Sequence, residues 1–146
     1  MSGMDDTDFA DMEKTVGTLL LPIVEDPDHI GNFLVIEYDQ VGALIDATDK
    51  PFITVRERGG VLDSDTFTAY TNIEVSCWGK SRQVARKAAK DSFRLLMQCE
   101  DGAEVDGVLI DGVEDMTGAE EVSLENPDDR CVTRMFQLSS RPQYQD

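Results

Sequence analysis

The sequence predicts an α+β fold in which an antiparallel sheet of about four strands carries two helices packed on one face. Two segments, 8–21 and 81–99, repeat apolar residues at intervals of three and four, which is the period of one helix face. Two others, 52–58 and 66–78, are rich in β-branched and aromatic residues, as strands are. The expected order is helix, two strands, helix, then two or three strands. This order is typical of helices that cover one face of an antiparallel sheet.

The first helix is expected at 8–21, after an acidic N-terminus, residues 1–7, that we expect to be mobile. Thr7 or Asp8 can cap its start. Pro22 limits its end, because a proline disfavours helical geometry at the residue before it. The apolar face consists of Phe9, Met12, Val16, Leu19, Leu20 and Ile23.

Residues 22–50 are expected to form a long acidic connection with at most a short strand at Phe33–Tyr38, because prolines and glycines interrupt them at four positions. Connections of this length in compact domains are usually functional or mobile. The chain has the size of a typical single domain, so we expect one domain over 8–142 and a short tail at 143–146.

The next two strands, 52–58 and 66–78, are expected to form an antiparallel hairpin whose loop is GGVLDSD, residues 59–65. Alternate residues of the second strand, including Ile73, Val75 and Cys77, are expected to face the core. The second helix begins after Ser81, whose hydroxyl can cap it. Its buried stripe is predicted to be Ala85, Ala88, Ser92, Leu95, Leu96 and Cys99. The last strands are expected in the apolar pieces 105–113, 120–125 and 131–140.

The chain of 146 residues has 13 basic and 30 acidic residues, a formal net charge of −17. Such a charge repels phosphate and argues against binding to DNA or to anionic membranes. No apolar run approaches the roughly 18 residues of a membrane span, and the acidic start does not resemble an export signal. The middle of the chain is the exception, since residues 50–100 hold 9 basic and 6 acidic residues.

No residue pattern indicates catalysis, a cofactor or a metal centre, so we expect a non-enzymatic protein. Asp26, Asp28 and His29 lack the alternating spacing of a calcium loop, and an exposed loop histidine is the plainer interpretation of His29. Cys77 has no neighbouring histidine or helix N-terminus to activate its thiol. The three cysteines are odd in number and lie among apolar residues, which predicts reduced thiols in the core.

The unusual feature is cationic, because four basic residues recur every four positions on the second helix, opposite its apolar stripe. We call Arg82, Arg86, Lys90 and Arg94 the cationic ridge. One interpretation is a solvated helix face. The other is a head-to-tail contact with an acidic surface of an identical subunit, which closes into a ring when the rotation permits. The residues alone leave both interpretations open.

Residues 50–100 resemble the tail-terminator proteins of long-tailed bacteriophages. The shared pattern is a Pro-aromatic-apolar strand ending in Arg-x-Gly-Gly, a second strand closing in an aromatic residue and Gly, then Ser-Arg and an alanine-bearing helix. The matching positions are Pro51, Phe52, Val55, Arg58, Gly59, Gly60, Trp78, Gly79, Ser81, Arg82, Ala85 and Ala88. The final strand, up to Pro142, fits the ending of these proteins in general terms.

The resemblance implies a virion subunit that forms a homohexameric ring on the end of the tail tube, stops tube growth and joins the tail to the head. The implied partners are further copies of the chain, the tail tube protein and the head-tail connector protein. The genome would pass through an acidic lumen, with no sequence-specific nucleic-acid binding and no membrane contact. The implied location is the head-proximal end of the tail, and the host cytoplasm during assembly.

The resemblance also suggests roles for two sets of residues. The cationic ridge is expected at the subunit interface. A tip that faces the lumen or a partner is expected at Gly59, Gly60, Asp63 and Asp65.

Two alternatives belong to other classes. A head-tail connector or tail-completion subunit would share the size, the fold class and the lack of catalytic residues. An acidic DNA mimic is suggested by the net charge of −17, but it needs acids in phosphate-like rows, and the cationic ridge argues against it.

Overall fold

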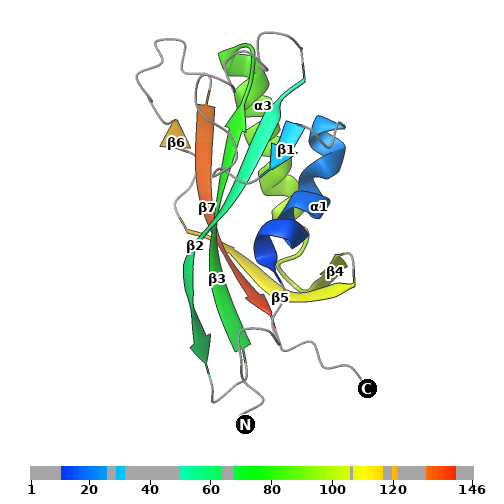
Figure 1. Cartoon of the computed structure of the whole chain (residues 1–146), viewed down its shortest axis with the longest axis vertical. Helices are drawn as coiled ribbons and strands as arrows, with labels where there is room; N and C mark the ends of the chain where they lie inside the picture. The colour runs from blue at the N-terminus through cyan, green and yellow to red at the C-terminus, as the bar shows by residue number, and fades with distance from the viewer. Residues whose placement is uncertain are drawn as a thin grey trace.

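The computed structural model describes residues 11–25, 29–31, 50–63, 68–105, 107–116, 120–121 and 131–140. These residues form two helices and seven strands (Figure 1). The helices are α1 (Met12–Val24) and α3 (Arg82–Met97). The strands are β1 (Ile30–Gly31), β2 (Phe52–Asp63), β3 (Thr68–Trp78), β4 (Ala103–Val105), β5 (Val108–Asp115), β6 (Glu120–Glu121) and β7 (Cys131–Ser140). The predicted α+β class is confirmed.

The sheet has the order β1-β2-β3-β7-β5-β4, and β6 pairs with β7. The short β1 runs parallel to β2, and every other pair is antiparallel. Its main antiparallel part, β2-β3-β7-β5-β4, has five strands where about four were predicted. The additional strand arises because 105–113 is not one piece. The chain turns at Gly107, whose φ of +79° suits glycine, so that β4 and β5 form a hairpin.

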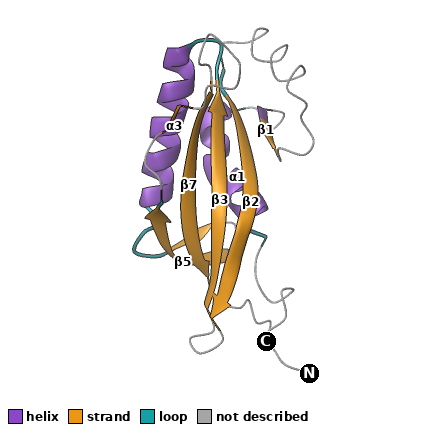
Figure 2. Cartoon of the chain, turned by 90° about the vertical axis from the view of Figure 1, so that its left-hand side faces the viewer, coloured by secondary structure: helices purple, strands orange, loops and turns teal. Residues whose placement is uncertain are grey.

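Both helices pack on the same face of the sheet, as predicted. α1 contacts β2, and α3 contacts β3 and β7. Figure 2 shows the opposite face of β2, β3 and β7 towards the viewer, with α1 behind them. Ile73, Val75 and Cys77 lie in the buried core between the sheet and the helices, which confirms the predicted core-facing residues of β3.

α1 starts and ends later than predicted. Its N-cap is Asp11, whose Oδ1 accepts hydrogen bonds from the backbone N–H groups of Glu13 and Lys14 at 3.1 and 3.3 Å. The predicted caps Thr7 and Asp8 lie outside the described residues. Pro22 lies inside the last turn and does not end the helix. A proline at this place removes only one hydrogen bond of the ladder, and the extra turn buries Val24 fully in the core.

The first part of the segment 22–50 is more structured than predicted. Its first residues complete α1, and β1 pairs with β2 through Ile30 opposite Ile53 and Gly31 opposite Thr54. A two-residue strand leaves too short a pattern to be recognised in sequence. The strand predicted at Phe33–Tyr38 lies outside the described residues, as do the predicted tails at 1–7 and 143–146.

The prediction of a loop at 59–65 was wrong for residues 59–63, which continue β2. The register shifts by one residue between Glu57 and Gly60, and the pairing then resumes as Gly60 opposite Thr71. Gly59 takes up the bulge at a φ of +101°. Gly60 lies so close to β3 that a Cβ there would be 2.1 Å from the Tyr70 carbonyl oxygen. The two glycines therefore form a bulge within the strand instead of ending it.

Candidate functional site

α3 is held so that its basic residues face outward. The Ser81 hydroxyl oxygen caps it by accepting a hydrogen bond from the Val84 N–H at 3.3 Å, as predicted. The side chains that face the sheet are small near the start of the helix and larger near its end. The buried residues of the helix are Ala85, Ala88, Ala89, Ser92 and Leu96, so Ala89 joins the predicted stripe, whereas Leu95 is only half-buried.

The structure brings the four residues of the cationic ridge together as one exposed row on α3. At a rise of about 1.5 Å per residue, the row is about 18 Å long. Arg94 is partly committed, because its Nη2 and the Lys87 Nζ both bind the Asp91 carboxylate, at 3.1 and 3.0 Å. Lys90 forms no ion pair with any residue that the structure describes. Lys90 therefore keeps its positive charge available to a partner.

A groove of about 590 Å³ runs beside the ridge, between α3 and the end of α1. Pro22, Ile23 and Leu95 supply its apolar part, and Lys90 and Arg94 lie along its rim. Glu25 also lines the groove and forms an ion pair with Lys50. The Lys50 ammonium group donates a hydrogen bond to the Glu25 carboxylate, and this bond and the positive charge of Lys50 lower the pKa of Glu25.

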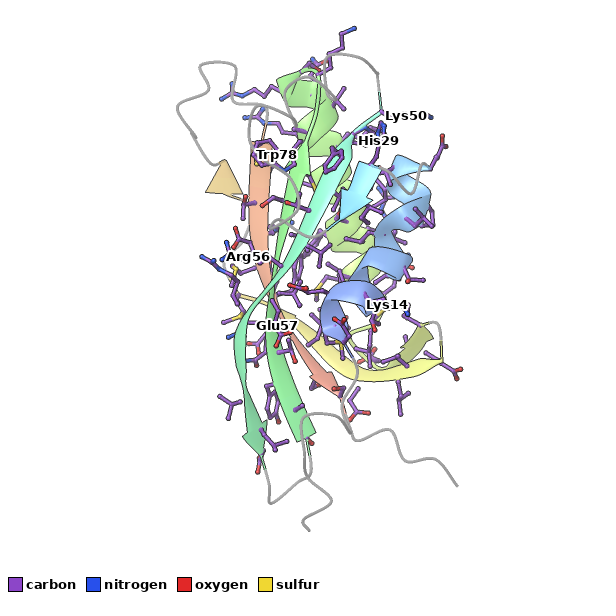
Figure 3. All side chains as sticks on the ribbon, viewed as in Figure 1. Lys14, His29, Lys50, Arg56, Glu57 and Trp78 are labelled. Atoms are coloured by element: carbon purple, nitrogen blue, oxygen red, sulfur yellow. The ribbon has the colours of Figure 1, made fainter. Side chains whose placement is uncertain are left out.

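The face of the sheet that the helices leave uncovered is polar. Arg58 and Glu74 form an ion pair across β2 and β3 at 2.9 Å, and the Gln137 amide donates to Asn72 at 3.3 Å. Arg56 points away from the helix layer on this face (Figure 3). At one end, Phe52, Trp78 and Cys131 form a small separate apolar cluster.

A shallow hollow of about 220 Å³ lies at the β5 end of this uncovered face. Two acidic residues line it, Glu100 and Glu114, together with the polar residues Tyr70, Gln137 and Ser139. Neither Glu100 nor Glu114 forms an ion pair within the described part of the chain. We call these five residues the acidic hollow.

The far end of the β2–β3 hairpin, residues 58–63 and 68–71, extends beyond the ends of both helices (Figure 1). We call it the arm. Residues 57–62 are exposed one after another, so neither face of β2 is covered here. Val61 is 68% exposed and Leu62 38%. Gly59, Gly60 and Asp63 of the predicted tip lie in the arm, and Asp65 lies outside the described residues.

The residues that the sequence analysis weighed for catalysis lie in unreactive surroundings. His29 is half-buried and not exposed as expected, with its Nδ1 3.3 Å from the Pro51 carbonyl oxygen and its ring 5.9 Å from that of Phe52. Burial raises the pKa of the Cys77 thiol to about 12, and its Sγ lies 3.6 Å from the Ser92 hydroxyl. All three cysteines are free and buried, as predicted.

Two further findings concern the described ranges alone. The described residues contain no group of three or more His, Cys, Asp or Glu side chains arranged to bind a metal ion. Asp26 and Asp28, considered with His29, fall outside these ranges. None of the described helices is long and apolar enough to cross a membrane.

Three of these surface features are not evident from the sequence alone. Val61 and Leu62 fall within the loop predicted at 59–65, so the sequence did not indicate that they are exposed residues of a strand. The groove and the acidic hollow combine residues far apart in the chain. One sequence feature points to the hollow, namely that residues 95–129 contain no lysine or arginine.

The fold and these surfaces define a two-layer α+β protein with charged and apolar features suited to contacts with other protein chains. A family model described as phage tail termination protein matches residues 8–146. The chain therefore belongs to the phage tail termination protein family, which confirms the resemblance seen in residues 50–100. It is a structural protein of the phage tail and thus of the virion. A search of curated proteins found no match.

Proposed function

We propose that the protein terminates the tail by forming a hexameric ring on the head-proximal end of the tail tube. The ring stops the addition of tube subunits and offers the surface that the head-tail connector protein binds. Membership of the family supports tail termination. The observation that carries the ring is the exposed cationic ridge on a subunit of net charge −17. Opposite charges on one subunit favour head-to-tail contacts, which close into rings when the rotation permits.

The arm is the part of this proposal that contacts the tube or the connector. In the arm β2 is an exposed edge of the sheet, because β1 pairs with it only at Ile53 and Thr54, and exposed strand edges pair readily with other chains. The exposed Val61 and Leu62 would gain burial in such a contact. Gly59, Gly60 and Asp63 belong to this partner-facing arm.

In this proposal the protein acts by occupying a tube end, without turning over a substrate. Burial raises the pKa values of Cys77 and Cys131 to about 12, which disfavours the thiolate that a nucleophilic cysteine needs. A ring of acidic subunits repels phosphate, which lets the genome pass without being bound. Assembly would take place in the host cytoplasm. In the same proposal, residues 8–142 form one folded domain.

The test is a tube-assembly reaction with purified tube protein from the same phage and increasing amounts of this protein. We expect one ring per tube end in negative-stain images, and a tube length that stops changing once rings match ends. Excess protein should have no further effect, because the action is stoichiometric. Undecorated ends and unchanged tube lengths would contradict termination, and binding to connector particles alone would favour a connector subunit.

A further inference from the structure

The cationic ridge and the acidic hollow lie on opposite faces of the two-layer fold. The ridge is on the side of α3 that points away from the sheet, since Ala85, Ala88 and Ser92 pack inward. The hollow is on the other side of the sheet. Pairing shows this, because Gln137 alternates with the buried residues Phe136 and Leu138 along β7 and is therefore on the uncovered face.

The other lining residues follow the same register. Glu114 is opposite Gln137, and Tyr70 is opposite Ser139, so all four side chains belong to the uncovered face. Glu100 reaches the hollow from the turn after α3, where its carbonyl oxygen would lie 3.4 Å from a Cβ at Gly112. The hollow is thus built from four separate parts of the chain, namely β3, the turn after α3, β5 and β7.

We propose that the acidic hollow of one subunit receives the cationic ridge of the next copy of this chain. The proposal rests on the proposed ring and names its two contacting surfaces. Glu100 and Glu114 line the hollow and form no ion pair within the described part of the chain, so a guanidinium or ammonium group placed there would give them an opposite charge. The hydroxyl of Tyr70 and the amide oxygen of Gln137 add acceptors for the N–H groups of an arginine.

The opposite placement of the two surfaces fits a ring. A two-fold dimer uses the same patch on both subunits, so it would need the ridge and the hollow on one face. Surfaces on different faces lead from one copy to the next, which gives a closed ring of identical subunits when the rotation permits and an open filament when it does not. The charge complementarity of the ridge and the hollow makes a second copy the proposed occupant.

The first variants reverse the charge of one surface at a time. The ridge-reversed protein carries Arg86→Glu and Lys90→Glu, and the hollow-reversed protein carries Glu100→Lys and Glu114→Lys. Each alone should lose the rings formed by the parent, with the dissociation constant of the subunit contact raised by about tenfold or more. All four residues are exposed, so circular dichroism and thermal melting should show folded monomers.

An equimolar mixture of the two reversed proteins gives the decisive result. Each ridge then meets a hollow of opposite charge, so alternating rings of the parent mass should form, as measured by mass photometry. Lys14→Glu and Glu104→Lys are matched controls, because both residues are exposed and lie outside the two surfaces. The single variants Lys90→Glu and Glu114→Lys should weaken ring assembly. The matched controls Lys14→Glu and Glu104→Lys, which make the same changes of charge elsewhere, should leave it unchanged.

Two outcomes would overturn the proposal in different ways. Rings of parent mass from either reversed protein alone, or no rings from the mixture, would show that the ridge does not meet the hollow, while the ring itself would stand. A parent protein that stays monomeric even with tail tubes present would contradict the ring of the proposed function.

Discussion

Arg134 on β7 forms an ion pair with Asp115 on β5, with its Nη2 3.3 Å from the carboxylate Oδ2. Both side chains are mostly buried, at 16% and 23% exposure. The guanidinium carbon also lies 4.1 Å from the centre of the Phe93 ring on α3, a cation–π contact. One arginine therefore connects two strands to the helix that carries the cationic ridge.

Replacing this arginine should destabilise the fold more than replacing an exposed one. Arg134→Ala removes the ring contact and leaves Asp115 without this partner in a poorly solvated place, so we expect a loss of about 2 kcal/mol. Arg58→Ala is the matched control, because Arg58 pairs with Glu74 but is 44% exposed, and it should cost less than about 1 kcal/mol. Urea denaturation measures both changes, and equal losses would refute the structural role of Arg134.

A charge introduced under α3 should prevent folding. Ala88 is 2% exposed and lies in the core with Ile73 and Val75. Ala88→Arg would bury an unpaired cation and overfill a close helix–sheet contact, so we expect a loss of more than about 3 kcal/mol or insoluble protein. Gln83→Arg on the exposed side of the same helix should change stability by less than about 0.5 kcal/mol. A soluble Ala88→Arg protein with the thermal stability of the parent would contradict the packing described.

The helix α3 could be predicted closely because its determinants are local. Ser81 is a strong cap, and the small and large apolar residues recur at helical spacing from Ala85 to Leu96. The boundaries that failed depend on tertiary contacts. The burial of Val24 extends α1 past Pro22, and the bulge at Gly59 lets β2 continue where a pair of glycines usually marks a turn.

The candidate surfaces could be predicted only in part, for the same reason. The cationic ridge lies on one helix, so its spacing alone places it on one face. The acidic hollow joins Tyr70, Glu100 and Glu114 from β3, a turn and β5, and only the strand order brings them together. Composition shows that 95–129 is acidic but not which face it occupies.

The arm should matter for binding and not for folding. Val61→Asp changes a side chain that is 68% exposed, so the free energy of unfolding should shift by less than about 0.5 kcal/mol. Binding to tube ends should fall, because the apolar contact is lost. Met116→Asp, at an exposed apolar position beyond the end of β5, should bind as the parent does. Co-sedimentation with tubes measures both, and equal binding of both variants and the parent would remove the arm from the interface.

The buried thiols make stability depend on alkaline pH. Burial raises the pKa values of Cys77 and Cys131 from 9.0 to about 12 in the folded state. Between these values the unfolded thiols lose protons and the folded ones keep them, so stability is complete below pH 9 and falls as the pH rises towards 12. The expected slope is about 1.4 kcal/mol per pH unit for each thiol.

Urea denaturation at pH 8 and at pH 10.5 measures this loss. Variants with Cys77→Ala and Cys131→Ala should be less stable at pH 8 but should lose less on raising the pH. The comparison therefore concerns the slope with pH and not the absolute stability. A slope unchanged by both substitutions would show that these thiols do not titrate on unfolding as described.

The most direct test of the account is the length of tails made by a phage that lacks this protein. Negative-stain images of lysates give the distribution of tail lengths, with the gene supplied from a plasmid as the control. The account predicts tubes that exceed the parent length with a broad distribution and carry no heads, and a return to the parent length on complementation. Tails of parent length that are joined to heads in its absence would contradict the account.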